Sequence, residues 1–172
     1  ARSYGIHSGM SMKMARQMCS EAVVVKGDHE QYSKYSNIIT DIIKETVPVY
    51  EKTSIDEFYM DLTGMDKFFG CFKFATELRQ RIIKETALPI SLAMSSNKTV
   101  AKIGTGQAKP NGQIEIVHGD EKNFLAPLSI KKIPMVGDKT YQLLRGMGIE
   151  KVKTVQDMPV EIMQQVLGEN RS

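Results

Sequence analysis

Two long segments of the sequence repeat apolar side chains at the i, i+3, i+4, i+7 spacing of an amphipathic α-helix. Asp28 is the expected N-cap of the first helix, which should run to about residue 47. The second helix is expected over residues 65–87. Each helix has one apolar stripe, so a sheet or another helix must cover it. The first stripe comprises Tyr32, Tyr35, Ile38 or Ile39, Ile42 and Val47, and the second comprises Phe68, Phe72, Ala75, Leu78 and Ile82.

Shorter segments with strand or helix signals alternate with these two helices. Short helices are expected at 11–19, capped by Ser11, and at 96–108, capped by Ser96 or Asn97. Their order with the strands, β-α-β-β-α-β-α-β, predicts an α+β fold of the ferredoxin-like type, in which helices cover one face of an antiparallel sheet. After about Gly119 only short helices separated by Gly and Pro are expected, which indicates a small all-α domain over residues 120–172. The expected strands are residues 21–25, the two sides of the 56–57 pair, 88–95 and 113–117.

The composition is that of an ordinary soluble protein, with 41% hydrophobic and 25% charged residues. No apolar stretch approaches the roughly 18 residues of a transmembrane helix, so no membrane partner is expected. Cys19 and Cys71 are too few for a disulfide framework and fit a reducing cytoplasm. The chain begins at Ala1 in mid-pattern, and we interpret it as a fragment of a longer protein.

Positive charge is clustered although the net charge is only +3. Between Ser129 and Lys153, six basic residues stand against Asp138 and Glu150. Three lysines and no acid lie between Lys98 and Gln113. Such clusters indicate a polyanionic partner, although a solvated helix face is the simpler alternative.

Two adjacent carboxylates, Asp56 and Glu57, interrupt a strand-like run. In a regular strand they would point to opposite faces, but a tight corner between two strands would let both lean toward one point. A divalent cation there would favour both ionised forms, and Mg²⁺ binds one or two carboxylates together with substrate phosphates. The alternative is an exposed acidic hairpin turn, and the spacing alone does not decide between them.

Three motifs occur in the order found in one enzyme family: "SIDE" within "YEKTSIDEFYMDLTG" (50–64), "SSNKTVAKIGTGQAKPNG" (95–112) and "IPMVGDKTYQLLRGMGI" (133–149). Over Ala1 to about Lys153 the chain resembles the Y-family DNA polymerases, the translesion enzymes of the DinB or DNA polymerase IV type. By this resemblance, residues 1–119 are the palm with the end of the fingers, without the first palm strand. Residues 120–172 are a thumb with a helix-hairpin-helix.

The resemblance implies roles for four residues of the polymerase centre. Asp56 and Glu57 would be the catalytic pair and would bind the magnesium ions, two of which are expected in the complete enzyme. Arg2 and Lys109 would contact the triphosphate of the incoming nucleotide. Without the resemblance, Arg2 is equally a terminal residue, and Lys109 a lysine at a helix end that interacts with the helix dipole.

The third motif has a physical rationale of its own. A short helix ending at Pro134, a glycine-containing hairpin and a new helix near Asp138 would direct backbone N–H groups at a DNA phosphate. Gly137, Lys139 and Thr140 are the residues expected nearest the DNA. The sequence departs from the family at Met135, where a glycine is usual.

The resemblance implies a fragment of a DNA-directed DNA polymerase that extends a primer by two-metal-ion phosphoryl transfer in translesion synthesis and DNA repair. The implied partners are primer-template DNA, a deoxynucleoside triphosphate and a sliding clamp that binds regions outside this chain. The fragment alone is expected to be inactive, because the first-strand aspartate, the aromatic gate and the little finger lie outside it. The alternatives are a non-catalytic relative that binds DNA or a partner protein, and another palm-fold enzyme such as a nucleotidyl cyclase.

Overall fold

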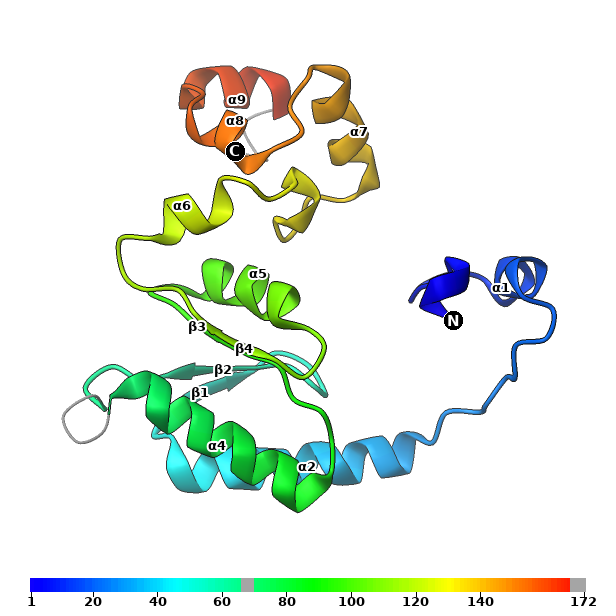
Figure 1. Cartoon of the computed structure of the whole chain (residues 1–172), viewed down its shortest axis with the longest axis vertical. Coiled ribbons are helices and arrows are strands. Elements are labelled where there is room, and N and C mark those ends of the chain that lie inside the picture. Colours follow the sequence, from blue (N-terminus) through cyan, green and yellow to red (C-terminus); the bar gives the residue numbers. More distant parts are fainter. Residues whose placement is uncertain (66–69, 168–172) are drawn as a thin grey trace. The chain divides into compact units, whose positions relative to one another are not determined.

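The computed structural model of the chain describes residues 1–65 and 70–167. These residues form two compact units, Ala1–Lys34 and Tyr35–Ser172 (Figure 1). The domain boundary expected near Gly119 lies inside the second unit, and this division does not test it. No helix in the described part of the chain has the length and apolarity needed to cross a membrane.

The first unit holds the 3-10 helix η1 (Arg2–Tyr4) and the helix α1 (Met12–Met18). The Ser11 hydroxyl accepts a hydrogen bond from the Met14 N–H at 3.3 Å, which confirms the predicted cap. The predicted strand at 21–25 is wrong, because this stretch has no regular structure and Val23 and Val25 are 87% and 82% exposed. A β-branched run becomes a strand only beside a partner strand, and none in the described part of the chain pairs with it.

Helix α2 (His29–Thr46) begins in the first unit and continues into the second. The Asp28 carboxylate accepts the Gln31 N–H at 3.1 Å, as its predicted N-cap role requires. The C-terminal half of the predicted stripe is confirmed by the burial of Ile39, Ile42 and Val47. Tyr32, by contrast, is 51% exposed.

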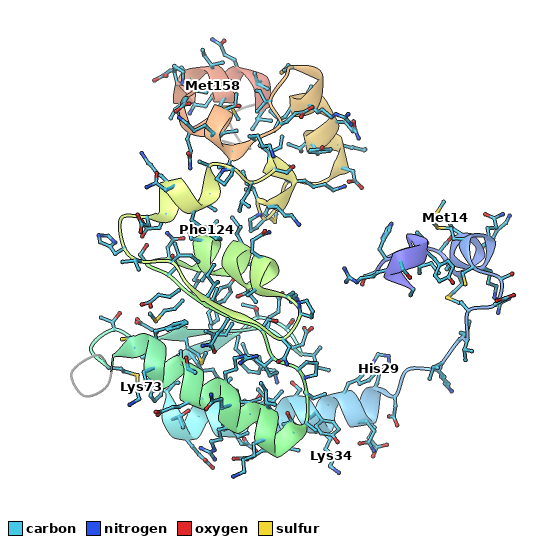
Figure 2. The ribbon with its side chains drawn as sticks, in the orientation of Figure 1. Met14, His29, Lys34, Lys73, Phe124 and Met158 are labelled. Atoms are coloured by element: carbon cyan, nitrogen blue, oxygen red, sulfur yellow. The ribbon has the colours of Figure 1, made fainter. Side chains whose placement is uncertain are left out.

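Helix α4 (Cys71–Thr86) begins later than predicted: Met65 lies in a turn, and Gly70 is the N-cap of the helix. Phe68, assigned to its stripe, lies outside the described residues. Ala75, Leu78 and Ile82 are buried as expected. Side chains of α2 and α4 form one hydrophobic core with side chains of the strands, which lie above these helices in Figure 2. The buried residues of this core are Ile39, Ile42, Ile43, Val47, Leu78 and Ile82.

The strands form two separate pairs within the described residues. Strands β1 (Val49–Lys52) and β2 (Phe58–Asp61) are antiparallel on the two sides of the acidic pair, as predicted. Strands β3 (Leu92–Met94) and β4 (Gln113–Glu115) are parallel, so the prediction of a wholly antiparallel sheet is wrong. The reason is the crossover through helix α5 (Lys98–Ala108), which returns the chain to the same end of the sheet.

Helices lie on both sides of the strands in Figure 1, with α5 on one side and α2 and α4 on the other. The expectation that all helices cover one face therefore holds for α2 and α4 but not for α5. Asn97 is the cap of α5, because its side chain accepts the Val100 N–H at 2.9 Å.

Only short helices follow β4 in the described chain, as predicted. Ile130, Leu144 and Ile149 form a second buried cluster, and Met158, labelled in Figure 2, packs against it. The elements are α6 (Glu121–Leu125), η2 (Ile130–Lys132), α7 (Asp138–Gly146), α8 (Val152–Gln156) and α9 (Val160–Leu167).

Candidate functional site

Residues 53–57 form a tight corner between β1 and β2. The Thr53 and Ser54 N–H groups both donate to the Glu57 carbonyl, at 3.0 and 3.4 Å. The Ser54 hydroxyl donates to Asp56 Oδ1 at 2.8 Å, a local contact typical of serine and aspartate in turns. From α2, the buried Ser36 hydroxyl donates to the Ile55 carbonyl at 2.6 Å. The corner that the sequence analysis required is therefore present and attached to the helix beneath it.

A lysine of α5 lies beside the acidic pair at this corner. Lys102 Nζ is 3.0 Å from Glu57 Oε2, and both side chains are about half exposed. The hydrogen bond to Glu57, and then its charge, raise the pKa of Lys102, with a smaller contribution from the charge of Asp56. Glu57 thus already holds one cation at the corner, whereas the Asp56 carboxylate accepts its hydrogen bond from Ser54.

The sequence places Lys102 only in a basic cluster and does not predict this contact with Glu57. Lys98, one helical turn earlier, pairs with Glu51 of β1, and its Nζ lies 5.4 Å from the centre of the Tyr59 ring. The i, i+4 spacing of the two lysines was the available signal that they share one face of the helix.

The donor set at the corner fits magnesium in chemical type. Asp56 and Glu57 are both exposed and offer hard carboxylate oxygens. In the part of the chain that the structure describes, no three His, Cys, Asp or Glu side chains are grouped so as to hold a metal ion. Two carboxylates are sufficient for Mg²⁺ only if other oxygens, such as those of a phosphate, complete its shell.

Lys109 follows the C-terminal end of α5, the helix that carries Lys102, and its side chain is exposed. The predicted turn is present, with Asn111 in the left-handed conformation at φ 47°. Gly112 has a steric reason to be glycine, because a Cβ there would lie 2.2 Å from the Ala108 carbonyl oxygen. Arg2 is exposed on η1 and belongs to the other compact unit.

The predicted phosphate hairpin lies between η2 and α7. The Val136 N–H donates to the Ile133 carbonyl at 3.2 Å, and the Gly137 N–H donates to the Met135 carbonyl at 3.0 Å. The Gly137 amide is therefore already engaged. Met135 has φ 71° and a side chain that is 99% exposed, so its bulk points to solvent.

Gly137 is the N-cap of α7 and supplies no side-chain cap. The first-turn N–H groups of such a helix, here those of Asp138, Lys139 and Thr140, have no partner within the helix. The Asp138 carboxylate is paired with Lys131 at 3.0 Å, and Lys139 is exposed. Of the three residues predicted to contact DNA, Lys139 and Thr140 thus lie in the first turn of α7, and Gly137 precedes that turn with its amide engaged. Their contacts with DNA remain predictions.

Comparisons with known proteins agree with the sequence motifs. Residues 1–106 match the impB/mucB/samB family model. A DNA polymerase IV of Dehalococcoides mccartyi is 37% identical over 169 residues, which are 98% of this chain and 43% of that protein. A DNA polymerase IV of Treponema denticola is 33% identical over the same shares of the two chains. The chain thus spans about 43% of the length of these relatives.

Solved structures of polymerases have the same fold. DinB from Sulfolobus solfataricus matches with a TM-score of 0.88 at 27% identity, over 98% of this chain and 50% of that one. An insertion ternary complex of Dbh DNA polymerase matches with a TM-score of 0.85, also at 27% identity, over 98% of this chain and 50% of that one. The chain belongs to the impB/mucB/samB family, the Y-family domain that its motifs predicted.

Proposed function

We propose that this chain is the palm and thumb segment of a DNA-directed DNA polymerase that extends primers past damaged bases. Residues 1–119 would be the palm with the end of the fingers, and residues 120–172 the thumb. The observation that carries the proposal is the corner at Asp56 and Glu57, where two exposed carboxylates are adjacent and Glu57 binds a lysine ammonium group at 3.0 Å. The activity belongs to the complete polymerase, and the 172-residue chain alone should be inactive.

Asp56 and Glu57 would hold magnesium at the corner between β1 and β2. The ions would supply the positive charge that stabilises the attacking and leaving oxygens of phosphoryl transfer. The chain's own part is positional, because the hydrogen bonds of Ser36 and Ser54 keep the corner in one conformation. Lys102 neutralises Glu57 in the structure, and Glu57 would have to leave this ion pair to serve as a metal ligand.

Arg2 and Lys109 would neutralise the triphosphate of the incoming deoxynucleotide. Cationic groups held against transferring phosphates stabilise the charge that develops in the transition state. Lys109 is suited to this because it is exposed and makes no ion pair within the described residues.

The hairpin before α7 would hold a phosphate of the primer-template duplex. The free N–H groups of the first turn and the Lys139 ammonium group would contact the backbone without reading its sequence. A sliding clamp would bind parts of the polymerase outside this chain. The isolated cysteines, both free thiols, suit work in a reducing cytoplasm.

The test is Asp56→Ala in the complete polymerase, assayed by primer extension in magnesium. We expect extension to be lost while affinity for primer-template DNA stays within about twofold, because Asp56 contacts the metal and not the duplex. The matched control is Glu51→Ala, which removes an exposed carboxylate from the same hairpin and should preserve extension. Near-normal extension by Asp56→Ala would refute the catalytic role and favour a non-catalytic DNA-binding module.

A further inference from the structure

An arginine of α4, Arg79, makes hydrogen bonds to the turn that follows Lys109. Arg79 Nε donates to the Ile90 carbonyl at 2.8 Å. Its Nη2 donates twice to Asn111, to the backbone carbonyl at 2.7 Å and to the side-chain Oδ1 at 2.8 Å. One guanidinium group therefore joins α4, the segment before β3 and the turn after α5.

A second contact from the same helix lies close by. Gln113 Nε2 donates to the Thr76 hydroxyl at 3.0 Å, and Thr76 precedes Arg79 by three residues on α4. The side chains of Thr76 and Arg79 are neighbours on one helix face and hold Asn111 and Gln113, the residues on either side of Gly112. The Leu92 N–H also donates to the Gly112 carbonyl at 3.1 Å, which ties the turn to the start of β3.

The turn needs such support because its backbone is not relaxed. Asn111 is in the left-handed region, which costs free energy for any residue with a Cβ, although asparagine tolerates it better than most. The chain also passes so close to the end of α5 that only glycine fits at position 112. Without an external hold, alternative conformations of Lys109–Gly112 would compete with the observed one.

From this geometry we infer that Arg79 is a positioning residue for Lys109. The inference rests on the proposed function, in which Lys109 binds the nucleotide triphosphate. Arg79 acts through the turn, because its hydrogen bonds go to Ile90 and Asn111, and the direction of the Lys109 backbone depends on where Asn111 is held. Loss of Arg79 should therefore weaken nucleotide binding without removing any group that touches the nucleotide.

The experiment is a double-mutant cycle in the complete polymerase, with KM for the nucleotide and kcat measured at saturating primer-template. Arg79→Ala should raise KM by about three- to tenfold, since a displaced charged contact to a phosphate loses part of its binding free energy. In the Lys109→Ala background, Arg79→Ala should change KM by no more than about twofold, because the effects of substitutions at residues that act as a unit do not add.

Arg81→Ala is the matched control, because Arg81 lies two residues away on α4 and pairs with Glu45 and Glu85 instead of the turn. It should leave KM unchanged even if it lowers the melting temperature as much as Arg79→Ala does. Arg79→Lys keeps the charge but cannot reach all three acceptors, so it should raise KM nearly as much as alanine. It also serves as the test variant if Arg79→Ala does not fold.

The outcomes separate the inference from the proposed function. If Lys109→Ala leaves KM unchanged, the proposed nucleotide contact of Lys109 fails, and the positioning role fails with it. If Lys109→Ala raises KM but neither Arg79 variant does, the inference about Arg79 is wrong and the nucleotide contact stands. Additive effects of the two substitutions would also overturn it, because Arg79 would then act independently of Lys109.

Discussion

Met135 and Lys139 lie four residues apart, in the hairpin before α7 and in its first turn. The first residue affects the stability of the protein and the second its charge at the predicted DNA contact. Met135 holds a left-handed backbone conformation, φ 71°, while its side chain is 99% exposed. A Cβ in this region costs free energy that the exposed side chain does not recover by burial. Lys139 lies in the first turn of α7, where its positive charge adds to the positive end of the helix dipole.

Replacing Met135 with glycine should stabilise the protein. The strain that is relieved, about 1–2 kcal/mol, exceeds the entropic cost of a glycine in the unfolded chain, about 0.4–1 kcal/mol, so the gain should be about 0.5–1 kcal/mol. Urea denaturation of the purified chain measures it. Met135→Ala is the control, because it removes the side chain but keeps the Cβ. An equal gain from alanine would show that the strain is not the cause.

Replacing Lys139 with alanine should weaken the binding of primer-template DNA equally for all sequences. One phosphate contact fewer should reduce the slope of log K against log salt concentration by about 0.9. The measurement is a salt titration of DNA affinity in the complete polymerase. An unchanged slope would mean that Lys139 lies on a solvated helix face and contacts no phosphate.

Among the elements, helix α5 makes contacts with both strand pairs. Its lysines Lys98 and Lys102 pair with Glu51 and Glu57 of the β1–β2 hairpin, and its buried Gly104 packs against β3 and the residues around β4. A Cβ on Gly104 would lie 2.6 Å from Ile116 Cδ1 and 2.9 Å from Ala93 Cβ. The helix can approach β3 and β4 this closely only because residue 104 has no side chain.

Gly104→Ala and Gly106→Ala should therefore have opposite effects on stability. The first should destabilise by about 1–3 kcal/mol through overpacking. The second, with nothing within 4 Å of the added Cβ, should stabilise by about 0.5–1 kcal/mol through helix propensity. Chemical denaturation of both variants checks the pair. If both substitutions stabilise, α5 does not pack against the strands as closely as the structure shows.

Helix α6 is connected to the segment before α5 by one carboxylate. Glu121 accepts hydrogen bonds from the Ser96 hydroxyl and, at 2.7 Å, from the Gly119 N–H. The hydrogen bond from Ser96 makes the largest contribution to lowering the pKa of Glu121 below its ordinary value of 4.5. A carboxyl whose pKa is lower in the folded than in the unfolded state stabilises the fold above its unfolded pKa.

This stabilisation should be lost as the pH falls below about 4.5 toward the lower, folded-state pKa. The stability difference between the wild-type chain and Glu121→Gln should therefore shrink as the pH is lowered through that range. Urea denaturation at several pH values measures it, and Ser96→Ala should reproduce part of the effect. A stability difference independent of pH would show that the Glu121 charge does not contribute.

At the scale of the whole molecule, the chain consists of two compact units, and the boundary between them, after Lys34, falls within α2. Both buried clusters lie in the second unit, Tyr35–Ser172. Residues 22–28, which precede α2, are exposed and have no regular structure. Stability should therefore reside in the second unit, while the stretch before α2 opens easily.

Limited trypsin digestion of the 172-residue chain should cut first after Lys26, in this exposed stretch. The product that begins at Gly27 should keep the melting temperature of the intact chain, because it retains both clusters. Lys44, within α2, and Lys84, within α4, serve as internal controls and should be cut much later. Early cleavage at either helical site would contradict this distribution of stability.

Features that depend on neighbouring residues were predictable from the sequence. The caps Ser11, Asp28 and Asn97 bond N–H groups three residues away, and the corner at Ser54 and Asp56 is equally local. Helical periodicity likewise needs no knowledge of the partner surface. The acidic pair and the three motifs were sufficient to predict the family, while the roles of the site residues remain predictions.

The tertiary structure decided what depends on residues far apart in the chain. The valines at 23–25 have strand propensity but no pairing strand in the described chain, and the β3–β4 pair is parallel because α5 crosses over between its strands. Lys102 meets Glu57 from 45 positions away, and Arg79 meets Asn111 from 32. The physical reason is that propensities and caps act over a single turn, whereas strand pairing and side-chain contacts across elements depend on how the chain returns upon itself.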